Sequence, residues 1–152
     1  MINKIQTKIY FLSLSIFILL IDQFTKYLIF YNYKTVIHRD FYLFRLDLVR
    51  NYGAAFNIFS GSRIFLSLIS VFFSILLIYL IFRKNTINSL DLYAYSFILG
   101  GTFGNGIDRI YKGFVIDFIN LNFMNFPVFN IADIYINVGF IFLLYNIFKN
   151  NR

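Results

Sequence analysis

Four long runs of hydrophobic residues follow one another along this chain, separated by more polar stretches. They extend roughly over residues 9–30, 64–82, 92–110 and 131–148. Each run is close to the length of about 20 residues that an α-helix needs to cross the hydrocarbon core of a bilayer. The pattern therefore predicts an all-α membrane protein with four transmembrane helices.

The stretch at residues 31–63 is the longest of these separators and contains an alternating segment at 41–50. Alternation of apolar and polar residues is typical of short strands with one apolar face. We therefore expect a small outer-face β-sheet in this first extramembrane loop. An irregular loop with aromatic side chains in the membrane interface is the alternative.

The chain contains no linker rich in glycine, serine or proline and no internal repeat, which favours one integral membrane domain over residues 1–152. The first hydrophobic run follows Lys4 and Lys8, as the apolar region of a secretory signal peptide does. No Ala-x-Ala cleavage site comes after it, and the first alanine is Ala54. We expect this run to remain in the mature protein.

The composition agrees with a membrane protein, since 59% of the residues are hydrophobic and only 14% are charged. The net charge is +7, but no basic run interleaved with aromatic residues suggests nucleic-acid binding. We expect the positive charge to lie at anionic phospholipid headgroups. The absence of cysteine excludes thiolate metal sites and a cysteine nucleophile, and the single His38 argues against a zinc site.

An even number of spans places both chain ends on one side of the membrane. This assigns each polar residue near a span end or in a loop to one of the two sides. Six of the seven acidic residues then fall on the side that we call outer. The inner side keeps one acid, Asp91, and a group of basic residues that fits the positive-inside rule: Lys4, Lys8, Arg83, Lys84, Lys149 and Arg152. The bias is weak, because the outer side also carries Lys34, Arg39, Arg45 and Arg50.

Charged residues inside predicted membrane helices need a physical reason, because each costs about 2.5 to 3.5 kcal/mol at mid-span on insertion scales. Asp22 and Lys26 lie four residues apart, so they share a helix face and can form an ion pair. A structural ion pair that orients the helix and a functional pair are both open.

The third run carries a polar stripe on one helical face, made of Gly101, Asn105, Asp108 and Lys112, with Arg109 beside it. The neighbouring glycines have no side-chain bulk, so they can admit either another helix or an extended substrate backbone.

Two further carboxylates, Asp117 and Asp133, are candidates for acid–base chemistry. Asp117 lies in a short apolar run, and Asp133 follows Asn130 in a pattern that is typical of a helix start. An ionised carboxylate can take a proton from water while a protonated one donates to a peptide carbonyl oxygen and later to the leaving nitrogen. A Mg²⁺ or Ca²⁺ site built from Asp108, Asp117 and Asp133 is the competing interpretation.

The order of several motifs resembles the lipoprotein signal peptidase (signal peptidase II) family over nearly the whole chain. The motifs begin with Asp22-Gln23-Phe24-Thr25-Lys26 and Arg50-Asn51-Tyr52-Gly53-Ala54-Ala55-Phe56. The third is Gly100-Gly101-Thr102-Phe103-Gly104-Asn105 with Asp108-Arg109, Gly113, Val115, Asp117 and Phe118, and the last is Phe129-Asn130-Ile131-Ala132-Asp133.

The resemblance implies an aspartic endopeptidase of the bacterial inner membrane, with its site on the outer (periplasmic) side and neither metal nor cofactor. The implied substrate is a prolipoprotein, cleaved just before a diacylglyceryl-modified cysteine. Asp117 and Asp133 would form the catalytic dyad. Residues implied to hold the substrate or the dyad, or to support the site, are Asp22, Lys26, Asn51, Gly53, Gly101, Asn105, Asp108, Arg109 and Asn130.

Three positions depart from the pattern of the family: Asn120 stands where an acid is frequent, Asn57 where a small residue is usual, and Ile134 where serine is common. None of them belongs to the dyad. The alternative from another class is a small transporter or channel with a polar path, but the ionisable residues gather at one face and do not extend through the bilayer.

The environment of each aspartate predicts how the dyad divides its proton. Asp133 is expected at the first turn of a helix, where free N–H groups favour an anion. Asp117 is expected in an apolar setting beside that anion, which opposes its ionisation unless Arg109 lies against it. We therefore expect Asp117 to hold the proton at rest.

Overall fold

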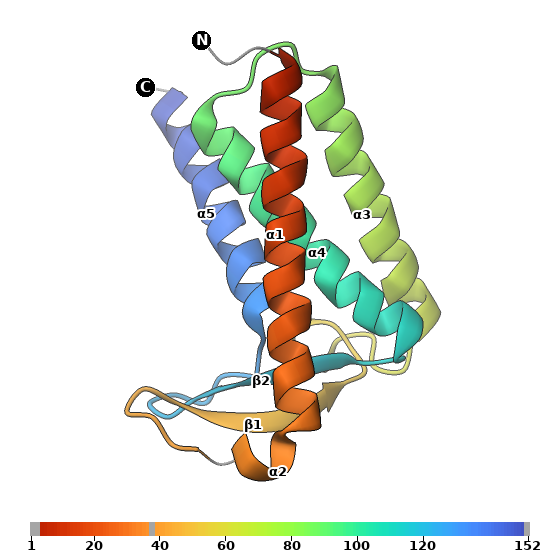
Figure 1. Cartoon of the computed structure of the whole chain (residues 1–152), viewed down its shortest axis with the longest axis vertical. Helices are drawn as coiled ribbons and strands as arrows, with labels where there is room; N and C mark the ends of the chain where they lie inside the picture. Colours follow the sequence, from red (N-terminus) through yellow and green to blue (C-terminus); the bar gives the residue numbers. More distant parts are fainter. Residues whose placement is uncertain (1–3, 37–38, 151–152) are drawn as a thin grey trace.

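Four long helices form a bundle that carries a two-stranded sheet at one end (Figure 1). The computed structural model describes residues 4–36 and 39–150, so His38 and Arg152 lie outside the described residues. The elements in chain order are α1 (Lys4–Tyr31), α2 (Tyr33–Val36), β1 (Phe44–Asn51), the 3₁₀ turn η1 (Ala55–Asn57), α3 (Arg63–Arg83), α4 (Ser89–Tyr111), β2 (Val115–Leu121) and α5 (Ile131–Asn150).

The helix α4 lies at the centre of the bundle and packs against α1, α3 and α5. Its glycines permit this close approach. A Cβ atom at Gly101 would lie 2.6 Å from the carbonyl oxygen of Ala132 in α5, and one at Gly100 would lie 2.7 Å from that of Ser15 in α1. Helix packing, one of the two interpretations left open for these glycines, is therefore what the structure shows at both positions.

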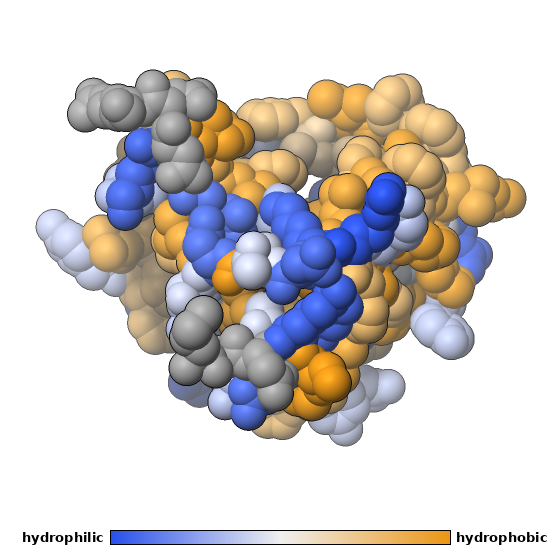
Figure 2. Space-filling view, turned by 90° about the horizontal axis from the view of Figure 1, so that it is seen from above, coloured by the Kyte–Doolittle hydropathy of each residue, from blue (hydrophilic) through white to orange (hydrophobic). Residues whose placement is uncertain are grey.

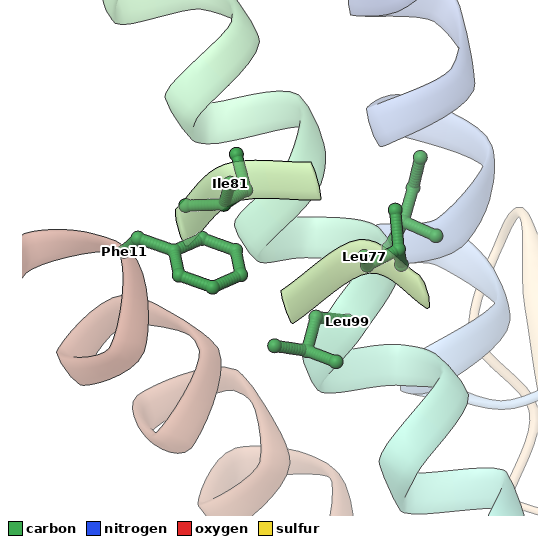
Figure 3. Packing of buried hydrophobic residues seen from close by; sticks show 5 residues of the cluster. Phe11, Leu77, Ile81 and Leu99 are labelled. Atoms are coloured by element: carbon green, nitrogen blue, oxygen red, sulfur yellow. The ribbon is translucent and has the colours of Figure 1, made fainter. Parts of the chain in front are cut away.

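A hydrophobic cluster fills the half of the bundle farther from the sheet (Figure 3). Phe11 of α1 and Ile81 of α3 are fully buried there, and Leu77, Ile98 and Leu99 complete the cluster. Most other large apolar side chains on α1, α3 and α5 point outward and are exposed. A chain that buries its polar groups and exposes its apolar ones is suited to a lipid environment.

Three helices, α1, α3 and α5, are long and apolar enough to cross a membrane when the described residues are considered. The helix α4 has 23 residues and a comparable length, but glycines and polar residues lower its hydropathy. The membrane prediction is thus supported by three helices, and the third predicted run, which forms α4, is a helix that packs against the other three.

The predicted sheet in the first loop was only half right. Residues 31–63 supply one strand, β1, and its antiparallel partner β2 comes from the segment between α4 and α5. Val49 pairs with Asp117 and Asn51 with Val115. The short apolar run around Asp117 has no helical or strand periodicity of its own, so its pairing with a strand 66 residues earlier was not visible in the sequence.

The two ends of the bundle differ in charge. At the end where α1 begins and α5 ends, hydrophilic side chains gather beside apolar ones (Figure 2), and the ends of α1, α3 and α5 there carry Lys4, Arg83 and Lys149. There Lys4 Nζ donates to Asn85 Oδ1 and Lys8 Nζ donates to the carbonyl oxygen of Phe82. The opposite end carries the sheet and the buried acidic residues described below.

Candidate active site

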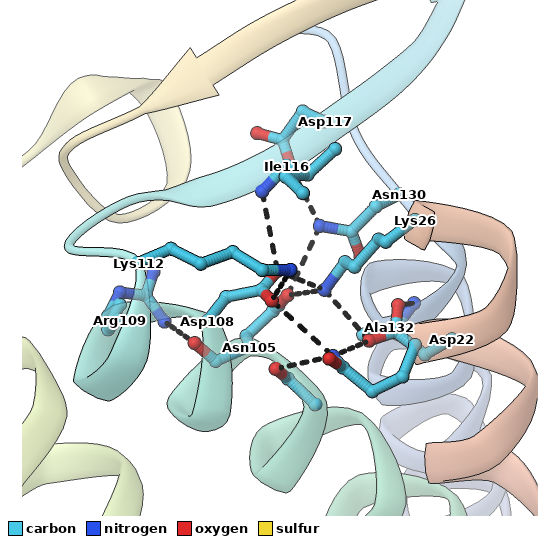
Figure 4. Close-up of polar contacts among 12 residues, drawn as sticks. Asp22, Lys26, Asn105, Asp108, Arg109, Lys112, Ile116, Asp117, Asn130 and Ala132 are labelled. Carbon is cyan, nitrogen blue, oxygen red and sulfur yellow. Dashed lines mark hydrogen bonds and ion pairs between the residues drawn. The ribbon is translucent and has the colours of Figure 1, made fainter. Parts of the chain in front are cut away.

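A buried ion cluster joins α1 to α4 beneath the sheet (Figure 4). Lys26 Nζ lies 2.8 Å from Asp22 Oδ2 and 3.0 Å from Asp108 Oδ2, and all three side chains have an exposed fraction of 0%. The Lys26 ammonium group also donates a hydrogen bond to Asn105 Oδ1 at 2.8 Å. The spacing of Asp22 and Lys26 predicted their pairing, and the structure confirms it.

The two carboxylates of this cluster also hold the backbone of neighbouring elements. Asp22 Oδ1 accepts a hydrogen bond from the N–H of Ala132 at the start of α5 (3.0 Å), and Asp108 Oδ2 accepts one from the N–H of Ile116 in β2 (3.4 Å). Lys112 Nζ pairs with the other oxygen of Asp108 at 2.8 Å. The cluster therefore sets where β2 and α5 begin relative to α1 and α4.

Gln23 is a member of this network that the sequence analysis did not single out. Its Nε2 lies 3.1 Å from Asp22 Oδ2 and 3.2 Å from the carbonyl oxygen of Gly104, and it reaches Asp108 Oδ1 at 3.5 Å. Its place next to Asp22 in the sequence was the available signal. Gly104 allows this contact, because a Cβ atom there would collide with the Asp22 carboxylate.

Two asparagines link Asp117 and Asp133 to this cluster. Asn105 Nδ2 donates to Asp133 Oδ1 (2.8 Å), while Asn130 Nδ2 donates both to Asp117 Oδ1 (2.6 Å) and to Asn105 Oδ1 (3.1 Å). The side chains of these four residues thus form one hydrogen-bonded chain with Lys26 behind it. Residues from α1, α4, β2 and α5 meet here although they are far apart in the sequence.

The start of α5 is a reciprocal cap, as the sequence predicted. Asn130 Oδ1 accepts from the N–H of Asp133 (3.0 Å), and Asp133 Oδ2 accepts from the N–H of Asn130 (3.1 Å). Both oxygens of the Asp133 carboxylate therefore receive N–H donors, one from the backbone and one from Asn105. This arrangement fixes the orientation of the carboxylate.

Asp117 lies in β2 with an exposed fraction of 2%. Its Oδ2 accepts a hydrogen bond from Asn51 Nδ2 of β1 at 2.9 Å, and Asn51 Oδ1 accepts from the N–H of Gly53. Burial, and after it the charge of Asp133, raises the pKa of Asp117 to about 7, against the opposing effect of the hydrogen bonds from Asn51 and Asn130. The protonated form of Asp117 therefore persists to higher pH than that of an exposed aspartate.

Arg109 spans from the last turn of α4 to the loop after β1. Its Nη2 donates to the carbonyl oxygen of Gly53 (3.0 Å) and its Nη1 to that of Asn105 (3.5 Å). Its Nε is buried and has no hydrogen-bond partner among the described residues. Within the same residues Arg109 makes no hydrogen bond to Asp117, but its guanidinium group interacts electrostatically with the carboxylates of Asp133 and Asp117.

A cleft of about 1060 Å³ opens onto the two aspartates. Its polar surface comes from Arg50, Asn51, Asn105, Arg109, Asp117, Asp133 and Asn137. The remaining walls are mainly apolar and include Ala55, Phe56, Met124, Phe126, Phe129, Ile134, Ile136 and Val138. The cleft therefore combines two carboxylates with a surface that fits an apolar ligand.

The positions that depart from the family pattern lie at different places. Ile134 lines the cleft, whereas Asn120 lies in β2 and donates to Asp47 Oδ2 at 2.6 Å.

Within residues 4–36 and 39–150, no three His, Cys, Asp or Glu side chains form a group that could hold a metal ion. Asp108 instead faces Lys26 and Lys112.

The sequence matches the model of the signal peptidase (SPase) II family over residues 14–149. The chain belongs to the signal peptidase II family. This is a family of aspartic-type proteases, so the membership decides between a protease and a transporter in favour of the protease.

Individual relatives agree with this assignment. The chain is 42% identical to the lipoprotein signal peptidase of Wigglesworthia glossinidia brevipalpis over 149 residues, which cover 93% of this chain and 94% of the relative. It is 40% identical to that of Gloeothece citriformis (strain PCC 7424) over 129 residues, which cover 82% and 79%.

Two solved structures of bacterial membrane enzymes, both obtained by the in meso method, share this fold. One has a TM-score of 0.83 and 32% identity, covering 93% of this chain and 88% of its own. The other has a TM-score of 0.81 and 33% identity and covers 98% of both chains. The protein is thus a multi-pass membrane protein of the signal peptidase II family.

Proposed function

We propose that this protein removes signal peptides from diacylglyceryl-modified prolipoproteins, cutting just before the lipidated cysteine. The observation that carries the proposal is the pair of carboxylates, Asp117 and Asp133, held by Asn130 and Asn105 at one end of an apolar cleft. The relatives named lipoprotein signal peptidase support the kind of substrate. Diacylglyceryl chains and a signal peptide are both apolar, as are the walls of the cleft.

In the proposed reaction, Asp133 starts ionised and Asp117 starts protonated. Asp133 takes a proton from water, whose oxygen bonds to the carbonyl carbon, while Asp117 gives its proton to the carbonyl oxygen. The C–N bond of the resulting tetrahedral intermediate then breaks. The leaving nitrogen receives the proton held by Asp133, and Asp117 takes back a proton from the hydroxyl group as the acid forms.

The remaining site residues are proposed to hold the substrate or the dyad. Arg109 lines the cleft with a guanidinium group held by the carbonyl oxygens of Gly53 and Asn105, and we expect it to donate to a carbonyl oxygen of the bound peptide. Asn51 and Gly53 connect Arg109 to Asp117. The two aspartates are positioned by residues of α1, of α4 and of the start of α5, namely Asp22, Lys26, Gly101, Asn105, Asp108 and Asn130.

We propose that all four long helices cross the membrane, with the sheet and the cleft at the outer side of a bacterial inner membrane. The polar groups of α4 are buried against its neighbours, which permits a span of lower hydropathy. The basic residues at the opposite end of the bundle, which include Lys4, Arg83 and Lys149, support this orientation by the positive-inside rule, and we expect them to meet anionic phospholipid headgroups.

The direct test is a cleavage assay with a purified diacylglyceryl precursor and the same precursor without the lipid. We expect the lipidated precursor to be cut before the cysteine and the unmodified one to be cut far more slowly, because it cannot fill the apolar cleft. Equal rates on the two precursors would contradict the proposed substrate class.

The pH dependence of cleavage follows from the raised pKa of Asp117. The acid must be protonated to donate, so kcat/KM is expected to fall as the pH rises through about 7, the pKa to which burial and the charge of Asp133 raise Asp117. Since the two carboxylates are coupled, the measured limb belongs to the dyad. Carboxyl infrared bands of the single Asp117→Asn and Asp133→Asn variants near neutral pH would locate the proton, and a proton on Asp133 with Asp117 ionised would reverse the assignment.

Chelators are expected to leave the activity unchanged, because both proposed catalytic groups work on water without a metal ion. The measurement is the cleavage rate after treatment with EDTA and dialysis, compared with an untreated sample. Loss of activity that Mg²⁺ or Ca²⁺ restores would favour the oxygen-ligand interpretation of the aspartates instead.

A further inference from the structure

The last turn of α4 and the residues after it contact β2 and the loop after β1, and they lead the chain into β2. The Asp108 side chain accepts from the N–H of Ile116 in β2, and the Arg109 side chain reaches the carbonyl oxygen of Gly53. Two residues after the helix ends, Gly113 turns the chain into β2 with a φ of 84°. Any change in this turn would therefore move both Arg109 and the strand that carries Asp117.

The end of α4 leaves carbonyl oxygens without a partner inside the helix, as every helix end does. The carbonyl oxygen of Asp108 accepts from the N–H groups of Lys112 (2.8 Å) and Gly113 (3.2 Å). The next two carbonyl oxygens, those of Arg109 and Ile110, need donors from elsewhere.

Arg63, the first residue of α3, supplies these donors. Its Nε lies 2.8 Å from the carbonyl oxygen of Arg109, and its Nη2 donates to that of Ile110. Its Nη1 lies 3.5 Å from the place that a Cβ atom of Gly113 would occupy, so the guanidinium group also lies against the turn into β2. The planar fork of arginine spans two adjacent carbonyl groups, and its charge is favourable at the negative end of a helix dipole.

We propose that Arg63 is a positioning residue that fixes the last turn of α4, and through it Arg109 and the start of β2, for catalysis. Arg63 acts through backbone groups and touches neither aspartate in this arrangement. The consequence for the reaction rests on the proposed function. The clamp itself is a statement about the fold and can be tested without a substrate.

The test compares Arg63→Ala, Arg63→Gln and Arg63→Lys with the wild type. Amide hydrogen exchange is expected to speed up in Arg63→Ala over residues 109–117 and to stay unchanged in the rest of the bundle. We also expect kcat/KM to fall by roughly 10-fold to 100-fold, since a misplacement of ~1 Å far from the reacting atoms can cost ~100-fold. Arg63→Lys should recover part of this loss, because an ammonium group keeps the charge but does not span both carbonyl groups as a planar fork.

The pH profile separates positioning from a loss of stability. A loosened β2 lets more water reach Asp117, so the alkaline limb of kcat/KM is expected to move to lower pH in Arg63→Ala. The charged groups that act on Asp117 are Asp133 of α5, Lys26 of α1 and Arg109 of α4, and none of them is removed in this variant. A smaller amount of folded enzyme would lower the rate without moving the limb.

Arg39→Ala is the matched control, because Arg39 also lies at the sheet end and donates to a backbone carbonyl oxygen, that of Thr35, but outside the cleft. It should behave as the wild type in all measurements. Wild-type exchange and activity in Arg63→Ala would overturn the inference, as would faster exchange spread evenly over all helices. Arg63→Gln, which keeps a long side chain, takes the place of the alanine variant if the latter does not fold.

The two proposals can fail separately. If the wild-type enzyme does not cut the lipidated precursor, the proposed function fails, while the exchange experiment still decides whether Arg63 holds the last turn of α4. If the wild type is active and Arg63→Ala matches it in rate, pH profile and exchange, only the inference about Arg63 fails.

Discussion

Cleavage of a diacylglyceryl precursor is expected to fall by on the order of 10³-fold or more in both Asp117→Asn and Asp133→Asn, which is the upper part of the range for loss of a general acid or base. An amide has nearly the volume of a carboxylic acid but can neither take a proton from water nor donate one to the carbonyl oxygen. The measurement is single-turnover cleavage in detergent or lipid, with the amount of folded protein checked for each variant.

The structure indicates that both variants still fold. In Asp133→Asn the amide oxygen can still accept one of the hydrogen bonds that Asp133 Oδ1 and Oδ2 receive. In Asp117→Asn the amide oxygen can still accept from Asn51 or Asn130. Asp91→Asn is the matched control, since it changes the same atoms at the other end of the bundle, where Asp91 pairs with Lys84 and Asn146. Turnover close to wild type in either dyad variant would refute the assigned roles.

Replacement of Lys26 by methionine is expected to lower the free energy of unfolding by about 3 to 5 kcal/mol. Methionine fills a similar apolar volume, but Asp22 and Asp108 would then be buried beside each other without the ammonium group that lies 2.8 Å and 3.0 Å from them. The variant can be compared with the wild type by thermal or detergent-induced unfolding. We expect its activity to fall as well, because the same cluster holds Asn105 and the starts of β2 and α5.

Lys112→Met provides the comparison for this prediction. Lys112 Nζ also lies 2.8 Å from Asp108, but its side chain is 35% exposed, so water screens the pair and its loss is expected to cost only about 0 to 1 kcal/mol. Similar unfolding in the Lys26 and Lys112 variants would mean that burial of the cluster does not control its contribution.

Local features of the fold could be predicted because they depend on residues close together in the chain. The hydrophobic runs predicted four helices, and the observed ones extend beyond the predicted runs by a few residues at most. The four-residue spacing of Asp22 and Lys26 predicted an ion pair, and the three-residue spacing of Asn130 and Asp133 predicted a helix cap. Both follow from helix geometry alone.

Family motifs placed Asp117, Asp133 and their neighbours on one list of site residues, but they could not say which atoms meet. Asn105 illustrates the difference, because its amide donates to Asp133 while its oxygen accepts from Lys26 and Asn130. The stripe on α4 indicated only that Asn105 faces the bundle. Which partners it finds there depends on how α1 and α5 pack against α4.

Long-range contacts were decided by the tertiary structure alone. The sequence favoured a sheet inside the first loop, whereas β1 pairs with β2 from beyond α4, and Arg63 was not recognised as a partner of a helix end 46 residues away. The sequence by itself therefore determined the helices, the membrane character and the family of this protein, since these follow from local spacing and from motifs. The pairing of β1 with β2 and the clamp on α4 arise only when the helices pack, because strand partners and capping donors are selected by proximity in space and leave no periodic signal in the chain.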